Sequence, residues 1–173
     1  MTTRSGQSTA DTAPASEGLR TPTLPPRWFI RGAWIAHRAV LRLTGGRRGL
    51  ARALSSGRFG YLQITTMGRR TGRERTAILG YFEDGPNLVT LAMNGWAAPE
   101  PAWWLNLAAH PDAHIVLKDG PRPVRARAAV GEERARLWGR FRDFTGWGDD
   151  VDAYAQLRPS ETAVVVLEPR SGA

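Results

Sequence analysis

Short apolar stretches separated by turn residues make up most of the chain from residue 61 onward. Stretches of this length that are bounded by Gly, Pro, Asn or Asp are typical of strands. Because the links between the first three are too short for a helical crossover, we expect those strands to be antiparallel neighbours. The pattern predicts strands at 61–66, 75–82, 88–93, 113–117, 124–130 and 162–167.

Helical stretches are predicted at 101–109 and 132–144, between the strands, and at 25–46, before them. A Pro-Pro pair begins the 25–46 helix and Gly45-Gly46 ends it. Six short strands with peripheral helices indicate a mainly β domain of the α+β class, folded as a small barrel or sandwich. The helix predicted at 132–144 carries an apolar stripe, formed by Leu137, Trp138, Phe141 and Phe144.

The N-terminal region divides into a tail and a basic helix. Residues 1–24 are rich in small and polar residues, and we expect them to be disordered because they cannot bury enough apolar surface to offset the entropy of ordering. The 25–46 helix is amphipathic, and it either packs on its own domain, roofs a pocket or rests on anionic lipid through residues 27–43. Its basic face consists of Arg27, Arg31, Arg38 and Arg42.

Composition narrows the class of protein. The chain has 173 residues, of which 42% are hydrophobic and 23% charged, the balance of one globular domain. No apolar run is long enough for a membrane-spanning helix. The absence of cysteine excludes disulfides, thiolate nucleophiles and cysteine metal sites, and it fits a reducing compartment. We therefore expect a cytoplasmic protein, placed at the inner face of the cell membrane if the 27–43 segment binds lipid.

The net charge of +8 is concentrated in one segment. Between Arg47 and Arg75 there are eight arginines and one acid, Glu74. Lys118 is the single lysine among 24 basic residues, and the planar fork of arginine is suited to phosphate and carboxylate groups. The distribution predicts an anionic partner for this segment.

Familiar catalytic constellations are missing from the sequence. It contains no Gly-x-Ser-x-Gly, no GxxxxGK[ST] and no GxGxxG placed between a strand and a helix. The histidines have no metal-ligand spacing, so no metal site is expected. An enzyme of this sequence would take its reactive group from a bound organic cofactor.

The stretch GRRTGRER at 68–75 is the most informative. Its glycines permit positive φ and a close approach of the backbone to a ligand, while its arginines and the Thr71 hydroxyl gather where two strands meet. Such a loop either binds an anion or is a solvated basic hairpin, and the residues alone leave both interpretations open.

The run ITTMGRRTGRERTAILGYFEDGPNLVTLAMNG, followed by PAWWLNLAAHP, resembles the deazaflavin-dependent nitroreductase family of actinobacteria. The resemblance covers 61–130 and continues more loosely to 169. It implies that residues 47–173 form a split β-barrel, a cofactor-binding domain for coenzyme F420. It also implies an oxidoreductase that transfers a hydride from reduced F420 to an electrophilic organic acceptor such as a quinone, enone or nitroaromatic.

The resemblance further implies which residues bind the cofactor. The loop residues Arg69, Arg70 and Thr71 would hold the phosphate and acidic tail of F420. The site would continue along the next strand, reach the end of the third strand and include the short helix. These further positions are Arg75, Thr76, Ala77, Ile78, Leu79, Gly80, Leu91, Ala92, Met93, Asn94, Ala102, Trp103, Trp104, Leu105 and Asn106. For the two tryptophans of the helix, packing beneath the barrel is the competing interpretation.

Acceptor binding is expected at Trp34, Trp96, Trp147 and Tyr154. Family members with nitroreductase activity carry several tyrosines after the late helix, and only Tyr154 has a counterpart here. This departure weighs against nitroreductase activity specifically. The sequence indicates neither the physiological acceptor nor the oligomeric state.

Three other interpretations stay open. The chain is alternatively an FMN-dependent split-barrel oxidoreductase, since FMN also presents a phosphate and a ring. It is alternatively an F420 carrier without turnover, or a basic nucleic-acid-binding barrel without catalysis. The tryptophans lie mostly in helical segments rather than on an exposed strand face, so no nucleic-acid partner is expected.

Overall fold

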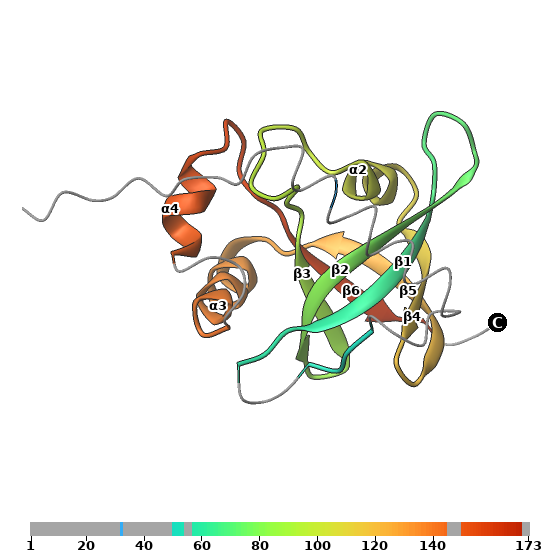
Figure 1. Ribbon diagram of the computed structural model, residues 1–173, viewed down its shortest axis with the longest axis horizontal. Coiled ribbons are helices and arrows are strands. Elements are labelled where there is room, and N and C mark those ends of the chain that lie inside the picture. The colour runs from blue at the N-terminus through green and yellow to red at the C-terminus, as the bar shows by residue number, and fades with distance from the viewer. Residues whose placement is uncertain (1–31, 33–49, 54–56, 145–149, 171–173) are drawn as a thin grey trace, which may run out of the picture.

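The computed structural model describes residues 50–53, 57–144 and 150–170, together with Gly32. At its centre is a closed barrel of antiparallel strands in the order β1-β2-β3-β6-β5-β4 (Figure 1). The predicted tail at 1–24 lies outside the described residues, as does the predicted 25–46 helix apart from Gly32. In the part of the chain that is described, no helix is long and apolar enough to cross a membrane.

Hairpins build the barrel wall, and one strand from the C-terminal end of the chain completes it. The strands are β1 (Gly60–Met67), β2 (Glu74–Asp84), β3 (Asn87–Leu91), β4 (Asp112–Leu117), β5 (Gly120–Ala128) and β6 (Val164–Pro169). The helices are α2 (Ala102–Ala109), α3 (Gly131–Arg142) and α4 (Val151–Gln156). β6 pairs with both β3 and β5, and β1 pairs with β4, which closes the barrel. The predicted mainly β fold is therefore confirmed, including the antiparallel pairing of the first three strands.

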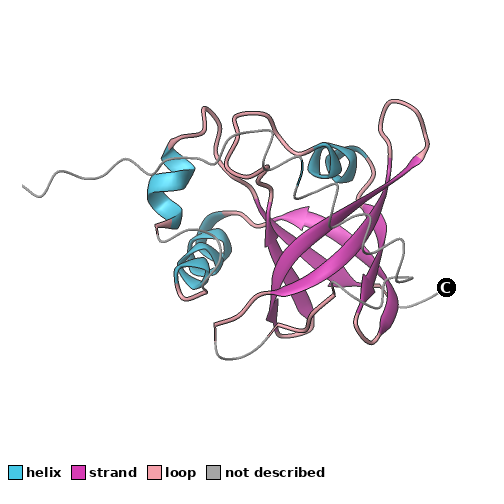
Figure 2. Cartoon of the chain, viewed as in Figure 1, coloured by secondary structure: helices cyan, strands magenta, loops and turns pink. Residues whose placement is uncertain are grey.

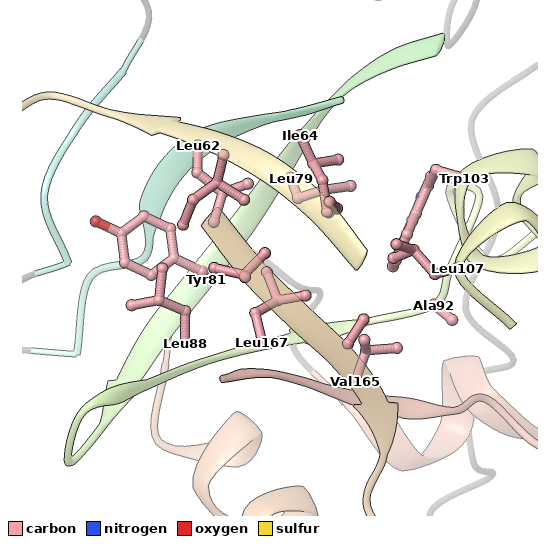
Figure 3. Close-up of a cluster of buried hydrophobic side chains, with 14 of the residues drawn as sticks. Leu62, Ile64, Leu79, Tyr81, Leu88, Ala92, Trp103, Leu107, Val165 and Leu167 are labelled. Atoms are coloured by element: carbon pink, nitrogen blue, oxygen red, sulfur yellow. The ribbon is translucent and has the colours of Figure 1, made fainter. Parts of the chain in front are cut away.

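Alternate residues of each strand point into the barrel and fill it. In β6, Val165 and Leu167 face the interior, while the residues on either side of Val165 face outward into a second apolar cluster. Figure 3 shows the interior side chains converging, with Trp103 and Leu107 of α2 at one end of the cluster. The barrel interior is therefore a packed core.

The second apolar cluster lies outside the barrel, beneath α3 and α4. Figure 2 shows these two helices beside the barrel, while α2 lies at its end. Leu137 and Phe141 of α3 are fully buried, and the Phe141 ring meets the Phe82 ring edge to face with centroids 4.8 Å apart. The apolar stripe predicted for 132–144 is thus the face that packs on the barrel.

The observed strands differ from the predicted ones mainly at their ends. β3 ends at Leu91 rather than Met93, because the Met93 amide donates to the Leu91 carbonyl at 2.8 Å and the chain turns out of the ladder. β5 begins at Gly120 rather than 124, and prolines at 121 and 123 concealed its first half because proline cannot donate to a ladder. α4 was not predicted, since a helix of six residues shows little periodicity.

Ion pairs fasten α3 to the barrel wall. Asp84, at the end of β2, accepts hydrogen bonds from Arg136 at 2.8 and 2.9 Å and from Arg140 at 2.6 Å. The hydrogen bond from Arg136 holds the pKa of Asp84 below its ordinary value, and partial burial opposes that effect. The Arg140 guanidinium also lies 4.4 Å from the centroid of the Phe82 ring. The attachment of α3 therefore depends on an ionised Asp84.

We expect Asp84→Asn to lower the free energy of unfolding at neutral pH by about 1 kcal/mol, because it removes a charged acceptor shared by two partly exposed arginines. A carboxyl whose folded-state pKa is depressed stabilises the fold above its unfolded pKa, here 3.8, and loses that contribution as the pH falls through the folded value. The difference between wild type and variant should therefore shrink below about pH 4. Denaturant titrations across this pH range measure it, and a constant difference would contradict the assignment.

Candidate functional site

The predicted cofactor-binding elements meet at one end of the barrel (Figure 1). The loop 68–73 joins β1 to β2 at this end. Because β3 runs antiparallel to β2, its last residue, Leu91, lies at the same end. α2 crosses this end with Trp103 and Leu107 packed against the barrel interior. The pairing of strands thus gathers side chains from distant parts of the sequence.

The backbone of the β1–β2 loop holds itself in one shape. The Gly68 carbonyl accepts hydrogen bonds from the amides of Thr71 and Gly72 at 3.1 and 2.8 Å, and the Gly68 amide donates to the Arg73 carbonyl at 2.9 Å. A Cβ at Gly68 would lie 2.8 Å from the Arg73 carbonyl oxygen, so the turn closes only around a glycine. Gly72 has a φ of 62°, in the left-handed region that favours glycine. The loop is therefore an ordered turn with exposed side chains.

A buried asparagine of α2 fastens this loop to the barrel. Asn106 is 4% exposed, and its Nδ2 donates to Thr66 Oγ1 at 3.2 Å. Its Oδ1 accepts from the backbone amide of Arg69 at 3.2 Å and from Arg69 Nη1 at 3.3 Å. The Thr66 hydroxyl in turn donates to the Arg75 carbonyl at 3.3 Å. One side chain thus joins α2, β1 and the loop, so the position of the loop depends on it.

The arginines of this loop differ from those elsewhere in their partners. Many arginines of the barrel wall and α3 pair with carboxylates, as Arg127 does with two glutamates. Among the residues that the structure describes, none of the arginines in or next to the loop forms an ion pair. The positive charge here is uncompensated, which favours an anionic ligand. These residues are Arg69, Arg70, Arg73 and Arg75, and the last three are exposed.

A stacked aromatic pair lies beyond the end of β3. The Trp96 ring is 5% exposed and stacks on Tyr154 of α4, with centroids 5.9 Å apart and planes 17° apart. The backbone of Trp96 has a φ of 60°, and no other described residue except glycine has a positive φ. Such a conformation costs about 1–2 kcal/mol for a residue with a Cβ. The two predicted acceptor-binding residues that the structure describes therefore lie together.

The other predicted site residues fall into two groups. One group has side chains buried in the core, so a ligand would meet only their backbone: Leu79, Leu91, Ala92, Trp103 and Asn106. The second group is exposed or half-buried: Arg69, Arg70, Thr71, Arg75, Thr76, Ala77, Ile78, Gly80, Met93, Asn94, Ala102, Trp104 and Leu105. Trp34 and Trp147 lie outside the described residues. For Trp103, packing beneath the barrel is the arrangement observed.

Sequence reasoning missed Arg158, which follows α4 and has a fully buried guanidinium. It donates to the Ala92 carbonyl at 2.9 Å and to Thr162 Oγ1 at 2.8 Å. Its carboxylate partner is Glu100, with Nη2 and Oε1 3.4 Å apart. No sequence signal marks this burial, because a lone arginine in a polar loop is usually exposed.

A six-stranded barrel with one end covered by a helix is the architecture of a split β-barrel. Solved structures share this fold: an F420-H2 dependent reductase, FDR-A, has a TM-score of 0.55 and 22% identity over 67% of this chain and 100% of that chain. A structure described as a domain-swapped dimer has a TM-score of 0.56 and 21% identity over 80% of this chain and 99% of that chain.

A family model for F420H(2)-dependent quinone reductases matches residues 36–169. Rv3178 of Mycobacterium tuberculosis (strain ATCC 25618 / H37Rv), which carries the name of an F420H(2)-dependent quinone reductase, is 36% identical over 108 residues. That alignment covers 59% of this chain and 83% of the relative. The chain belongs to the F420H(2)-dependent quinone reductase family.

Family membership confirms the predicted activity and cofactor. The protein is an oxidoreductase that uses coenzyme F420 and a small-molecule acceptor. The comparison therefore favours F420 over FMN, and catalysis over nucleic-acid binding. Among the described residues, no group of three His, Asp or Glu side chains is placed to hold a metal ion. The residues assigned to the cofactor and the acceptor stay predictions.

We expect Asn106→Ala to loosen the β1–β2 loop while the barrel stays folded. The substitution removes the buried acceptor of the Arg69 amide and one partner of the Thr66 hydroxyl, which should lower the unfolding free energy by about 1–3 kcal/mol. Hydrogen exchange followed by mass spectrometry should show faster exchange in 68–73. Asn87→Ala, at the opposite end of the barrel, is the matched control and should leave this exchange unchanged. Undiminished protection in the Asn106 variant would refute the role of this side chain.

Proposed function

We propose that the arginines of the β1–β2 loop hold the phosphate and acidic tail of coenzyme F420, and that this barrel end presents the ring to a quinone. One observation carries the proposal. Arg69, Arg70 and Arg73 form no ion pair with any described residue, although they stand on an ordered loop next to α2. Uncompensated guanidinium groups held in place are well suited to a polyanionic ligand.

The loop offers side chains rather than backbone amides to such a ligand. The amides of Thr71 and Gly72 donate to the Gly68 carbonyl, and the Arg69 amide donates to Asn106. These donors are therefore already used, unlike those of a phosphate-binding loop that cradles its ligand with free amides. Guanidinium groups donate paired hydrogen bonds to both phosphate and carboxylate oxygens, which matches a phosphodiester followed by an oligoglutamate tail.

The neighbouring surface residues would flank the ring. Met93 and Asn94 follow the end of β3, and Ala102 and Trp104 lie on α2, all with exposed or half-buried side chains. When bound, reduced F420 supplies the hydride. The contribution of the protein is position and electrostatics, because the arginines hold the anionic end and leave the ring against the barrel end.

The stacked pair of Trp96 and Tyr154 would border the acceptor. A flat aromatic surface suits a planar quinone or enone. Reduction of a quinone leaves an anion that must be protonated, and the Tyr154 phenol is the group of this pair that carries a proton suited to the step. Family members with nitroreductase activity carry several tyrosines after the late helix, whereas this chain has only Tyr154 there. We therefore expect quinones to be better acceptors than nitroaromatics.

We expect the double variant Arg69→Ala, Arg70→Ala to raise the dissociation constant for F420 by about 10- to 100-fold, because it removes charge-assisted hydrogen bonds. The loss should grow with the number of glutamates in the coenzyme tail. Titration followed by F420 fluorescence measures it. Arg122→Ala is the matched control, since Arg122 lies at the opposite end of the barrel and pairs with Asp119 at 2.5 Å. Normal F420 binding by the double variant would show that the loop does not hold the anionic end.

We further propose that residues 27–43 make a peripheral contact with anionic lipid at the inner face of the cell membrane. The basic and apolar faces predicted for this segment support the proposal. A chain lacking residues 1–46 should sediment less with anionic liposomes at low salt, while its F420 dissociation constant changes by less than about twofold. Equal sedimentation of the two chains would return the segment to a purely structural role.

A further inference from the structure

The buried guanidinium of Arg158 binds both ends of the segment that carries Trp96. Its Nη1 donates to the carbonyl of Ala92, directly after β3, at 2.9 Å. Its Nη2 lies 3.4 Å from Oε1 of Glu100, just before α2. A second bond from Nη1 reaches Thr162 Oγ1 at 2.8 Å and ties the clamp to the chain entering β6. Arg158 thus closes the base of the 92–100 loop.

The loop closed in this way is the one with the unusual backbone. Trp96 keeps a positive φ, a conformation that persists only where the surroundings hold it. Its ring stacks on Tyr154, and Tyr154 lies in α4, which ends two residues before Arg158. The clamp and the stack therefore connect the same two segments, one through polar contacts and the other through rings.

The ion pair itself is incompletely satisfied. Arg158 Nε and Glu100 Oε2 are buried and have no hydrogen-bond partner among the residues that the structure describes. Buried ion pairs with unsatisfied atoms gain little stability, and apolar residues of similar volume often serve as well or better. The arrangement is better explained by the geometry that it imposes on the 92–100 loop than by stability.

We infer that Arg158 is a positioning residue for the electron acceptor. By clamping the ends of the 92–100 loop it holds Trp96 against Tyr154, and so fixes the position in which the Tyr154 ring meets a planar quinone. The side chain of Arg158 has no exposed surface, so it acts through Trp96 and not by touching the acceptor. This inference rests on the proposed function, in which the stacked pair borders the acceptor.

The test is the Arg158→Lys variant with menadione, a naphthoquinone, as acceptor. Lysine keeps the charge but lacks the fork that reaches Ala92 and Glu100 together. We expect the KM for menadione to rise about tenfold, with the F420 dissociation constant changed by less than about twofold. Calorimetric titration with menadione should show the same loss of affinity without turnover. Arg134→Lys is the matched control, because Arg134 donates to the Thr162 carbonyl at 3.2 Å, and it should change neither value.

A double-mutant cycle separates positioning from general damage. If Arg158 acts through Trp96, Arg158→Lys should raise the KM by less than about twofold when Trp96 is already alanine. Full additivity of the two effects would overturn the inference, as would an unchanged menadione KM in the single variant. If Arg158→Lys does not fold, Glu100→Gln takes its place in the same cycle. The proposed function has its own test: normal F420 binding by the Arg69→Ala, Arg70→Ala double variant would contradict it, whatever the result for Arg158.

Discussion

The open end of the barrel must be covered, and the helix that covers it also positions the proposed cofactor site. A closed barrel excludes water from its interior only where its ends are filled, and α2 fills one end with Trp103 and Leu107. Asn106 is next to Leu107 in the sequence and is buried on the same helix. It therefore meets Thr66 and the amide of Arg69. Packing of the core and placement of the arginine loop are two results of one contact.

Arginine has different roles in different parts of the molecule. On the wall and on α3 its charge is matched by carboxylates, and those pairs attach elements to one another. In the β1–β2 loop the arginines have no such partners among the described residues, and their charge is available to a ligand. A net charge of +8 alone does not distinguish these roles. The distribution of carboxylates around each guanidinium does.

The barrel could be predicted from the sequence because the pairing of its hairpin strands is determined by short stretches of the chain. Short links between apolar stretches require antiparallel hairpins, and β1, β2 and β3 pair accordingly. The clustering of arginines at 68–75 could also be predicted, because these residues are neighbours in the sequence. The role of Asn106 could not be predicted. The sequence places Asn106 and Trp103 on one helix, but it does not indicate whether their side chains meet a ligand or the core.

Long-range contacts set the limit of sequence reasoning here. Arg158 bonds to a carbonyl 66 positions earlier in the chain, and nothing near it in sequence indicates that it is buried. The positive φ of Trp96 was equally unexpected, because tryptophan has no local reason to adopt it. Both features depend on how α4 packs against the end of β3. Only the assembled fold brings those segments together.

The arginine loop and the 92–100 loop are held in place by different residues, and this has a consequence for specificity. Asn106 holds the arginine loop from α2, whereas Arg158 holds the 92–100 loop from the segment after α4. Under the proposed function, the first contact governs the grip on the coenzyme and the second governs the space for the acceptor. The acceptor side can then change in sequence without loosening the cofactor.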